Sequence, residues 1–265
     1  MNMLHFGTMK PGSRVLVLGA SGGLGSAIAH ACAGTGASLI LWGRDTAKLE
    51  ALKALCLAAG ANTVTTRSLD LRDLDDALVA LVAEDDARPV DMAIFASGLG
   101  DIRAPGDLFE DPQLVTRLAT VNFVAPASLA SAMAQRMAVR RRGRITLIGS
   151  AAAFHGLPFS AAYCASKAGL ARFADSLRIA LRPHGVTVTL VSPGFIDTPA
   201  ARQVPGPKPF MLSPEQAAQA VLKATLRGKP HLIVPWPFAL VRLLVAALPR
   251  FLRDRLLKSL TPPGI

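Results

Sequence analysis

The sequence predicts a doubly wound α/β fold, in which helices cover both faces of a parallel sheet. Short apolar segments such as 14–18 and 144–148 alternate with longer segments of helical spacing along the chain. Strands of a parallel sheet are buried on both faces, so they are continuously apolar and lack a polar–apolar alternation. With 265 residues, 51% of them hydrophobic, the chain can form one large core. We therefore expect a single domain over residues 1–265.

The expected strands are short and apolar, and they lie at 14–18, 38–41, 64–69, 91–95, 144–148 and 186–191. The expected helices lie between them, at 24–34, 46–59, 71–84, 113–137 and 160–181. A later helix should begin at Ser213, because Pro214 suits a first helical turn and Gln216 completes a capping box with Ser213. We find no repeat and no linker between domains.

The composition narrows the class of protein. Residues 1–10 contain no apolar segment typical of a secretion signal, and we expect a cytoplasmic protein. The three cysteines, Cys32, Cys56 and Cys164, form no metal-ligating cluster, so we expect buried thiols and no metal. The net charge of +11 could attract an anionic lipid, an acidic carrier protein or a polyphosphate cofactor, or could simply be solvated. No nucleic-acid-binding motif accompanies this charge, so we expect no nucleic acid partner.

A glycine-rich turn follows the first expected strand directly. Its residues are Gly19, Ser21, Gly22, Gly23, Leu24 and Gly25, and a helix comes next. Glycines allow the backbone to turn tightly and to approach a pyrophosphate, which the N-terminus of the helix stabilises. The turn therefore predicts a dinucleotide site in a Rossmann fold, although its spacing differs from the common G-x-G-x-x-G pattern.

The end of the second strand should select between the two nicotinamide dinucleotides. An acidic residue there accepts the ribose hydroxyls of NAD, whereas an arginine suits the 2′-phosphate of NADP. Arg44 follows Gly43 at this point, and Asp45 comes next. We predict NADP(H), because Arg44 comes first and Ser21 can add a phosphate contact. Asp45 is the argument for NAD(H).

A second group of residues predicts proton transfer. Tyr163, the only tyrosine, precedes Lys167 by four residues, so the two side chains share one helix face. A nearby cation lowers the pKa of a phenol, which makes it a usable general acid or base at neutral pH. Ser150 follows an apolar strand and could bond the same substrate oxygen. A lone tyrosine is more often a core or interface residue, so the pair gains weight from the dinucleotide turn.

With these motifs and Asn122 in place, residues 12–200 resemble the short-chain dehydrogenase/reductase family. The resemblance implies that Asn122, Ser150, Tyr163 and Lys167 form a catalytic tetrad. Tyr163 would give a proton to a carbonyl oxygen that Ser150 orients, while nicotinamide delivers a hydride to the carbon. Lys167 would lower the pKa of Tyr163 and bind the nicotinamide ribose, and Asn122 would hold a water that relays protons.

The resemblance also implies further cofactor contacts. Asp70 matches the acid that contacts adenine, and the loop after the sixth strand would pass the nicotinamide. The implied set is Asp70, Leu71, Ala96, Gly98, Tyr163, Lys167, Pro193, Gly194, Ile196 and Thr198. The sequence departs from the family pattern at 95–98, where Phe-Ala-Ser-Gly replaces Asn-Asn-Ala-Gly, and this puts the local packing in doubt.

Substrate specificity should come from loops at the C-terminal strand ends. Residues 99–109, 154–159 and 195–212 are candidates, and their aromatic residues suggest either an apolar pocket or ordinary lid packing. We expect residues 201–230 to form a lid and 231–265 to form a final strand and amphipathic helices. Two such helices, near 238–248 and 249–260, could lie on a membrane surface, cover the pocket or contact another subunit.

The sequence therefore predicts an NADP(H)-dependent oxidoreductase that interconverts a ketone and a secondary alcohol of a hydrophobic or lipid-like substrate. One alternative is a 3-oxoacyl-[acyl-carrier-protein] reductase, because an acidic carrier suits the basic charge. Another is a non-catalytic scaffold that senses the nucleotide. The resemblance implies a homodimer or homotetramer assembled through the helices near 113–137 and 160–181.

Overall fold

The fold is built on one sheet of seven parallel strands, and the computed structural model describes residues 9–100, 104, 106–204 and 206–262. The strand order is β3-β2-β1-β4-β5-β6-β7. The bounds are β1 Arg14–Leu18, β2 Ser38–Gly43, β3 Thr63–Ser68, β4 Met92–Phe95, β5 Gly143–Ile148, β6 Val186–Pro193 and β7 His231–Val234. The order reverses between β1 and β4, and ligands of doubly wound sheets bind beyond the C-terminal strand ends at such a point. The predicted fold class is confirmed.

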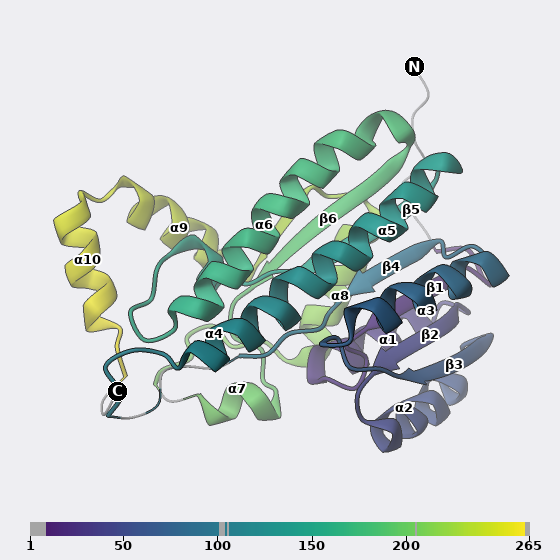
Figure 1. Ribbon diagram of the computed structural model, residues 1–265, viewed down its shortest axis with the longest axis horizontal. Helices are drawn as coiled ribbons and strands as arrows, with labels where there is room; N and C mark the ends of the chain where they lie inside the picture. The colour runs from purple at the N-terminus through teal and green to yellow at the C-terminus, as the bar shows by residue number, and fades with distance from the viewer. Residues whose placement is uncertain (1–8, 101–103, 105, 205, 263–265) are drawn as a thin grey trace.

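Helices cover both faces of this sheet (Figure 1). One face carries α1 (Gly23–Ala33), α2 (Thr46–Ala58) and α8 (Pro214–Leu226), whose buried side chains join one core cluster. The other face carries α3 (Leu74–Ala87), α5 (Ala125–Val139) and α6 (Ala161–Leu181), which form a second cluster. Strand β1 contributes to both, because Val15 and Val17 point to the first cluster and Leu16 and Leu18 to the second.

Several predicted bounds are corrected by the structure. Helix α3 begins at Leu74 rather than 71, because the Asp73 backbone N–H is bonded in a turn to the carbonyl of Asp70. The helix expected over 113–137 is divided into α4 (Pro112–Ala119), a π-helical turn (Thr120–Val124) and α5. Part of 195–212 forms the short helix α7 (Pro199–Gln203). Residues 101–103, 105 and 205 of the predicted loops, and residues 1–8 at the N-terminus, lie outside the described residues.

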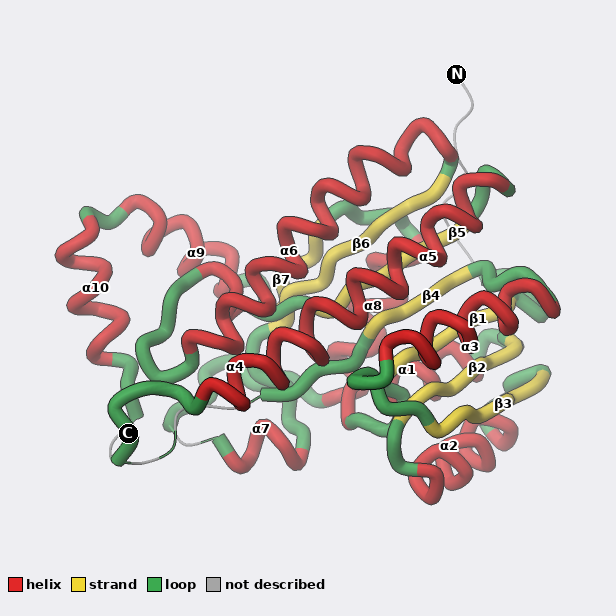
Figure 2. The backbone as a smooth tube through the Cα atoms, viewed as in Figure 1, coloured by secondary structure: helices red, strands yellow, loops and turns green. Residues whose placement is uncertain are grey.

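The two expected C-terminal helices are present as α9 (Pro237–Ala247) and α10 (Arg250–Ser259). They follow β7, and Figure 2 shows them extending beyond the sheet on the side away from β3. Of the helices in the described ranges, none is both long enough and apolar enough to cross a membrane.

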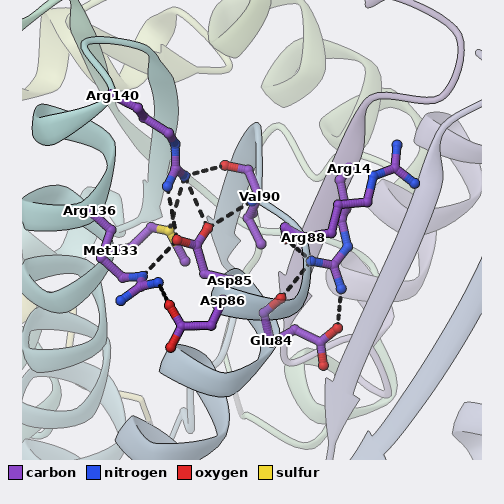
Figure 3. Close-up of polar contacts among 9 residues, drawn as sticks. All are labelled: Arg14, Glu84, Asp85, Asp86, Arg88, Val90, Met133, Arg136 and Arg140. Atoms are coloured by element: carbon purple, nitrogen blue, oxygen red, sulfur yellow. Dashed lines mark hydrogen bonds and ion pairs between the residues drawn. The ribbon is translucent and has the colours of Figure 1, made fainter.

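A buried carboxylate joins α3 to α5 (Figure 3). Asp85 accepts hydrogen bonds from the backbone N–H of Val90 (2.8 Å), from Nε of Arg136 (2.6 Å) and from both terminal nitrogens of Arg140 (2.8 and 3.1 Å). Arg136 also pairs with Asp86 on the surface. Two of the cations that make up the net positive charge, Arg136 and Arg140, therefore serve the fold.

Candidate active site

The glycine turn lies between β1 and α1, at the C-terminal edge of the sheet. Gly19 has a φ of +82°, and a β-carbon there would lie 2.6 Å from the backbone nitrogen of Ser97. A β-carbon at Gly25 would lie 2.1 Å from the carbonyl oxygen of Gly19. Both glycines are therefore required by the close approach of the turn to the loop after β4 and to itself.

The N-terminus of α1 fits a phosphate group. Its N-cap residue is the exposed Gly22, which offers no side-chain hydrogen bond, whereas Asp45 caps α2 and Ser213 caps α8. An uncapped helix N-terminus presents backbone N–H groups and a partial positive charge to an anion. Gly23 lies against Thr198, since a β-carbon at Gly23 would be 2.6 Å from Thr198 Cγ2. The structure thus brings the turn and the predicted nicotinamide loop together.

The end of β2 presents an exposed cation, Arg44, beside a carboxylate that already accepts a hydrogen bond, Asp45. Asp45 accepts a hydrogen bond from the backbone N–H of Lys48 (3.0 Å), and this bond lowers the pKa of Asp45. Arg44 is exposed, and Ser68 donates a hydrogen bond to its carbonyl oxygen (3.0 Å). Gly43 gives room to Ser21, whose Oγ would be 2.5 Å from a β-carbon on Gly43.

The residues predicted to contact adenine lie beyond β3. Asp70 is engaged by Arg72, whose Nη2 lies 2.6 Å from Oδ2 of Asp70 and whose backbone nitrogen lies 3.0 Å from Oδ1. Hydrogen bonds from Arg72 lower the pKa of Asp70. The Leu71 side chain is buried in the core, which leaves its backbone for a ligand contact.

Tyr163 and Ser150 meet at the C-terminal end of β5. Tyr163 lies in the first turn of α6, and Ser150 lies just after β5 in extended backbone. The Ser150 hydroxyl is within reach of the Tyr163 phenol and acts to lower its pKa. Ser150 Oγ also accepts a hydrogen bond from the backbone N–H of Ala152 (3.1 Å), which orients the hydroxyl. The predicted convergence of these two groups is thus present.

Lys167 lies one helical turn after Tyr163 and is buried. Its Nζ donates a hydrogen bond to the carbonyl oxygen of Ile148 (3.0 Å). Burial lowers the pKa of this amine to about 8.

In this structure the net pKa of Tyr163 is raised, which is opposite to the direction that we expect from Lys167 alone. Burial raises the pKa of the Tyr163 phenol above its ordinary value, the Ser150 hydrogen bond lowers it, and Cys164 adds to the rise. Desolvation acts on both groups of the pair, and it disfavours the charged form of each. Helical spacing places two side chains on one face but does not report how much water reaches them.

Asn122 connects three parts of the site from within the π-helical turn. Its Oδ1 accepts a hydrogen bond from the backbone of Leu99 (2.8 Å), and its Nδ2 donates to the Leu99 carbonyl (2.9 Å) and to Ser166 Oγ (3.2 Å). Ser166 donates in turn to the Tyr163 carbonyl (2.8 Å). Pro126 has no N–H for the Asn122 carbonyl, which favours the wider turn at this position.

The loop after β4 borders the same residues. Ala96 donates a hydrogen bond to the Leu18 carbonyl (2.9 Å), which continues the pairing of β4 with β1. A β-carbon at Gly98 would lie 3.2 Å from Lys167 Nζ and 3.5 Å from Asn122 Oδ1. Gly98 therefore lets the backbone pass between the amine and the amide, and the sequence change at 95–98 has not opened this part of the site.

The loop after β6 carries the remaining predicted cofactor residues. Pro193 ends the strand, Gly194 bonds to the Val234 carbonyl (2.8 Å), and Ile196 forms a bridge with Leu212. Thr198 caps α7 through its hydroxyl. Sequence reasoning missed Phe238 of α9, which covers this loop: a β-carbon at Gly194 would lie 2.2 Å from Phe238 Cε2. No local motif links positions 44 residues apart.

The aromatic residues of the specificity loops contact the C-terminal helices. Phe195 and Phe210 each lie 6.3 Å from the ring of Phe238, centroid to centroid. The guanidinium of Arg242 lies 4.8 Å from the ring of Phe154. Burial, and then the charge of Arg253, lower the pKa of neighbouring His155. These contacts join the three phenylalanines to α9, and Phe210 keeps 59% of its surface exposed.

Comparison with known proteins places the chain in a family. The family model of the short chain dehydrogenases matches residues 13–208. An uncharacterised oxidoreductase of Myxococcus xanthus is 34% identical over 240 residues, which cover 90% of this chain and 94% of that protein. A hydroxysteroid 11-beta-dehydrogenase 1-like protein of Xenopus laevis is 32% identical over 240 residues, with 87% and 82% covered.

A solved structure agrees with these relatives. A short-chain dehydrogenase of Sphingobium yanoikuyae in complex with NADPH superimposes with a TM-score of 0.75 at 25% identity and covers 89% of this chain and 96% of its own. The matched residues 13–208 contain the glycine turn, Asn122, Ser150, Tyr163 and Lys167. The chain therefore belongs to the short-chain dehydrogenase/reductase family of oxidoreductases.

Proposed function

We propose that the protein is an NADP(H)-dependent oxidoreductase that interconverts a ketone and a secondary alcohol. The observation that carries this proposal is the meeting of Tyr163 and Ser150 at the end of β5, next to Lys167 and across the sheet edge from the uncapped α1. A proton donor, a polarising hydroxyl and a cradle for pyrophosphate are the protein groups that carbonyl reduction requires.

The proposed roles follow from the contacts. Tyr163 gives its proton to the carbonyl oxygen in reduction and takes it back in oxidation, and the raised pKa keeps the phenol protonated at neutral pH. Ser150 donates a hydrogen bond that polarises the carbonyl. Asn122 holds the loop after β4, Lys167 is bonded to the end of β5, and both bind the ribose side of the cofactor. The nicotinamide, when bound, supplies or accepts the hydride.

The preference for NADP(H) over NAD(H) rests on Arg44. Asp45 is used as the N-cap of α2, so its carboxylate is less available to ribose hydroxyls than the sequence order suggests. Arg44 remains exposed at the strand end, and a guanidinium matches a phosphate group well. The structural neighbour in complex with NADPH supports the same choice.

The substrate is proposed to be hydrophobic. Aromatic side chains line the loops beyond β5 and β6, and one relative's name refers to a hydroxysteroid. We place the enzyme in the cytoplasm, where its three buried free cysteines would stay reduced.

We also propose a homo-oligomer, a dimer or tetramer assembled through α5 and α6. These two helices run side by side in Figure 1 and expose Val139 and Ile179. Light scattering at several protein concentrations, with Ile179→Glu as the disrupting variant, would test this assembly.

One experiment tests the reaction itself. Purified protein is mixed with NADPH and a panel of bulky ketones, and loss of NADPH absorbance is followed, with acetoacetyl-CoA included to detect an acyl-carrier-type reductase. Tyr163→Phe should lower turnover by about 10³-fold and leave NADPH binding unchanged, because the phenol proton is lost but the ring remains. Unchanged turnover in Tyr163→Phe would contradict the proposal, and binding without turnover in the native protein would support a nucleotide sensor.

A further inference from the structure

The outward side of α9 and α10 is unusually apolar. Trp236, Leu243, Leu244 and Phe251 are 70%, 65%, 67% and 72% exposed. We call the following set the C-terminal apolar surface: Trp236, Leu240, Val241, Leu243, Leu244, Phe251, Leu252, Leu256 and Leu260, all of them exposed. A continuous group of large apolar side chains in contact with water marks a surface that binds something.

The inward side of the same helices is already occupied by the protein. Phe238 packs against Phe195 and Phe210, and Val245 and Leu257 are buried. Arg242 lies over the ring of Phe154. Helix α9 is therefore docked on the loops beyond β5 and β6, and α10 buries Leu257, so the exposed apolar side chains belong to helices that already pack against the protein.

The charge beside this surface identifies the partner. Residues 237–260 contain five cations, Arg242, Arg250, Arg253, Arg255 and Lys258, and one acid, Asp254. Asp254 lies near Arg250 (3.8 Å) and Arg253 (3.7 Å), so the acid is shared by two arginines. On α10, Leu252, Leu256 and Leu260 recur every four residues along one side, whereas Arg255 and Lys258 follow Phe251 by four and seven residues and share its side of the helix. Lys and Arg can extend toward phosphate groups while their stems cover apolar surface.

A bilayer fits these features better than a second copy of the chain. A symmetric contact between two copies would bring the same cations together across the interface and would be opposed by their repulsion. Helices of 11 and 10 residues are too short to span a bilayer, but amphipathic basic helices of this kind lie in the plane of the headgroups.

We propose that the C-terminal apolar surface binds the face of a bilayer that contains anionic phospholipid, with α9 and α10 lying in its plane. Because Phe238 and Arg242 join these helices to the loops that carry Gly194 and Phe154, the bound bilayer lies on the substrate side of the molecule. This surface and its partner do not depend on the reaction proposed above.

Flotation of the full-length protein with lipid vesicles tests the proposal. The protein should float with vesicles of phosphatidylcholine mixed with phosphatidylglycerol, and much less with phosphatidylcholine alone. The double variant Leu243→Asn/Leu244→Asn should reduce partitioning by roughly 10-fold or more, because two side chains no longer enter the apolar layer. Arg255→Gln/Lys258→Gln should reduce it by about 10-fold on the anionic vesicles only.

The matched control is Val79→Asn, which changes an equally exposed apolar residue on α3 (71%) and should leave flotation unchanged. Circular dichroism establishes that each variant is folded. Failure of the folded native protein to float with anionic vesicles overturns the proposal, as does equal flotation of the leucine double variant. Light scattering that shows a changed subunit number in that variant, with flotation unaffected, would assign the surface to a second copy instead.

Discussion

The phenol of Tyr163 on α6 lies within reach of the hydroxyl of Ser150, which follows β5 and acts to lower the phenol pKa. Thirteen residues separate the two in the sequence, and they come together because β5 ends where α6 begins its first turn. Ser150 is further oriented by the backbone N–H of Ala152. The pair thus presents one acid and one polarising group at the same edge of the sheet.

The first prediction concerns Ser150→Ala. The substitution removes the group that would polarise the carbonyl and the hydrogen bond that lowers the pKa of Tyr163. We expect kcat for ketone reduction to fall by about 100-fold, with little change in NADPH binding. Steady-state kinetics and cofactor fluorescence measure the two effects. Ser259→Ala, at an exposed position on α10, is the control, and an equal loss there would contradict the role of Ser150.

The second prediction concerns pH. Alcohol oxidation requires the phenolate of Tyr163, and burial raises the pKa of this group above its ordinary value. We therefore expect kcat/KM for oxidation at saturating cofactor to keep rising as the pH increases from neutral to about 10, the ordinary pKa of tyrosine. If kcat/KM for oxidation instead stops rising below about pH 8, the pKa of Lys167, the bound cofactor must lower the pKa of the Tyr163 phenol. The residual oxidation rate of Tyr163→Phe should not increase with pH over this range.

The third prediction concerns cofactor choice. Arg44→Ser removes the exposed guanidinium at the end of β2 and should lower kcat/KM for NADPH by roughly 10- to 100-fold, the value of a charged hydrogen bond. The kcat/KM of the same variant for NADH should stay within about threefold of the native value. Lys48→Ser, which changes an exposed cation one turn into α2, is the matched control. Equal loss with both cofactors would assign Arg44 to the fold rather than to the 2′-phosphate.

The fourth prediction concerns the buried carboxylate between α3 and α5. Asp85→Asn removes the carboxylate partner of Arg140, leaves Arg136 with the exposed Asp86, and should lower the free energy of unfolding by about 3 kcal/mol or more, measured by urea denaturation at pH 7. Asp86→Asn, exposed and bonded to the same Arg136, should cost less than about 1 kcal/mol.

The same carboxylate should also make stability depend on pH. Desolvation raises the pKa of Asp85, but hydrogen bonds from Arg140, Val90 and Arg136 outweigh it and lower the pKa in the folded protein. The stabilisation is therefore complete above the pKa of the unfolded chain, about 4, and is lost as the pH falls toward the folded value. In Asp85→Asn, the free energy of unfolding should therefore fall less steeply as the pH is lowered below about 4. An unchanged pH dependence would contradict the role of Asp85.

Local patterns determined much of this protein. Apolar segments alternating with helical ones specify a parallel sheet covered on both faces, and the turn after β1 uses glycine at Gly19 because its φ of +82° suits glycine. The spacing of Tyr163 and Lys167 places both on one face of α6. These features depend on residues close together in the chain, so the sequence alone predicts them.

Tertiary packing decided the rest. The pKa directions of Tyr163 and Lys167 depend on how far the folded protein excludes water, which no spacing reports. The hydrogen bonds of Asn122 to Leu99, the use of Arg136 and Arg140 to hold Asp85, and the contact of Phe238 with Gly194 each join distant segments. Such contacts form only when the chain has closed on itself, because the free energy that selects them comes from burial and from partners far away in the sequence.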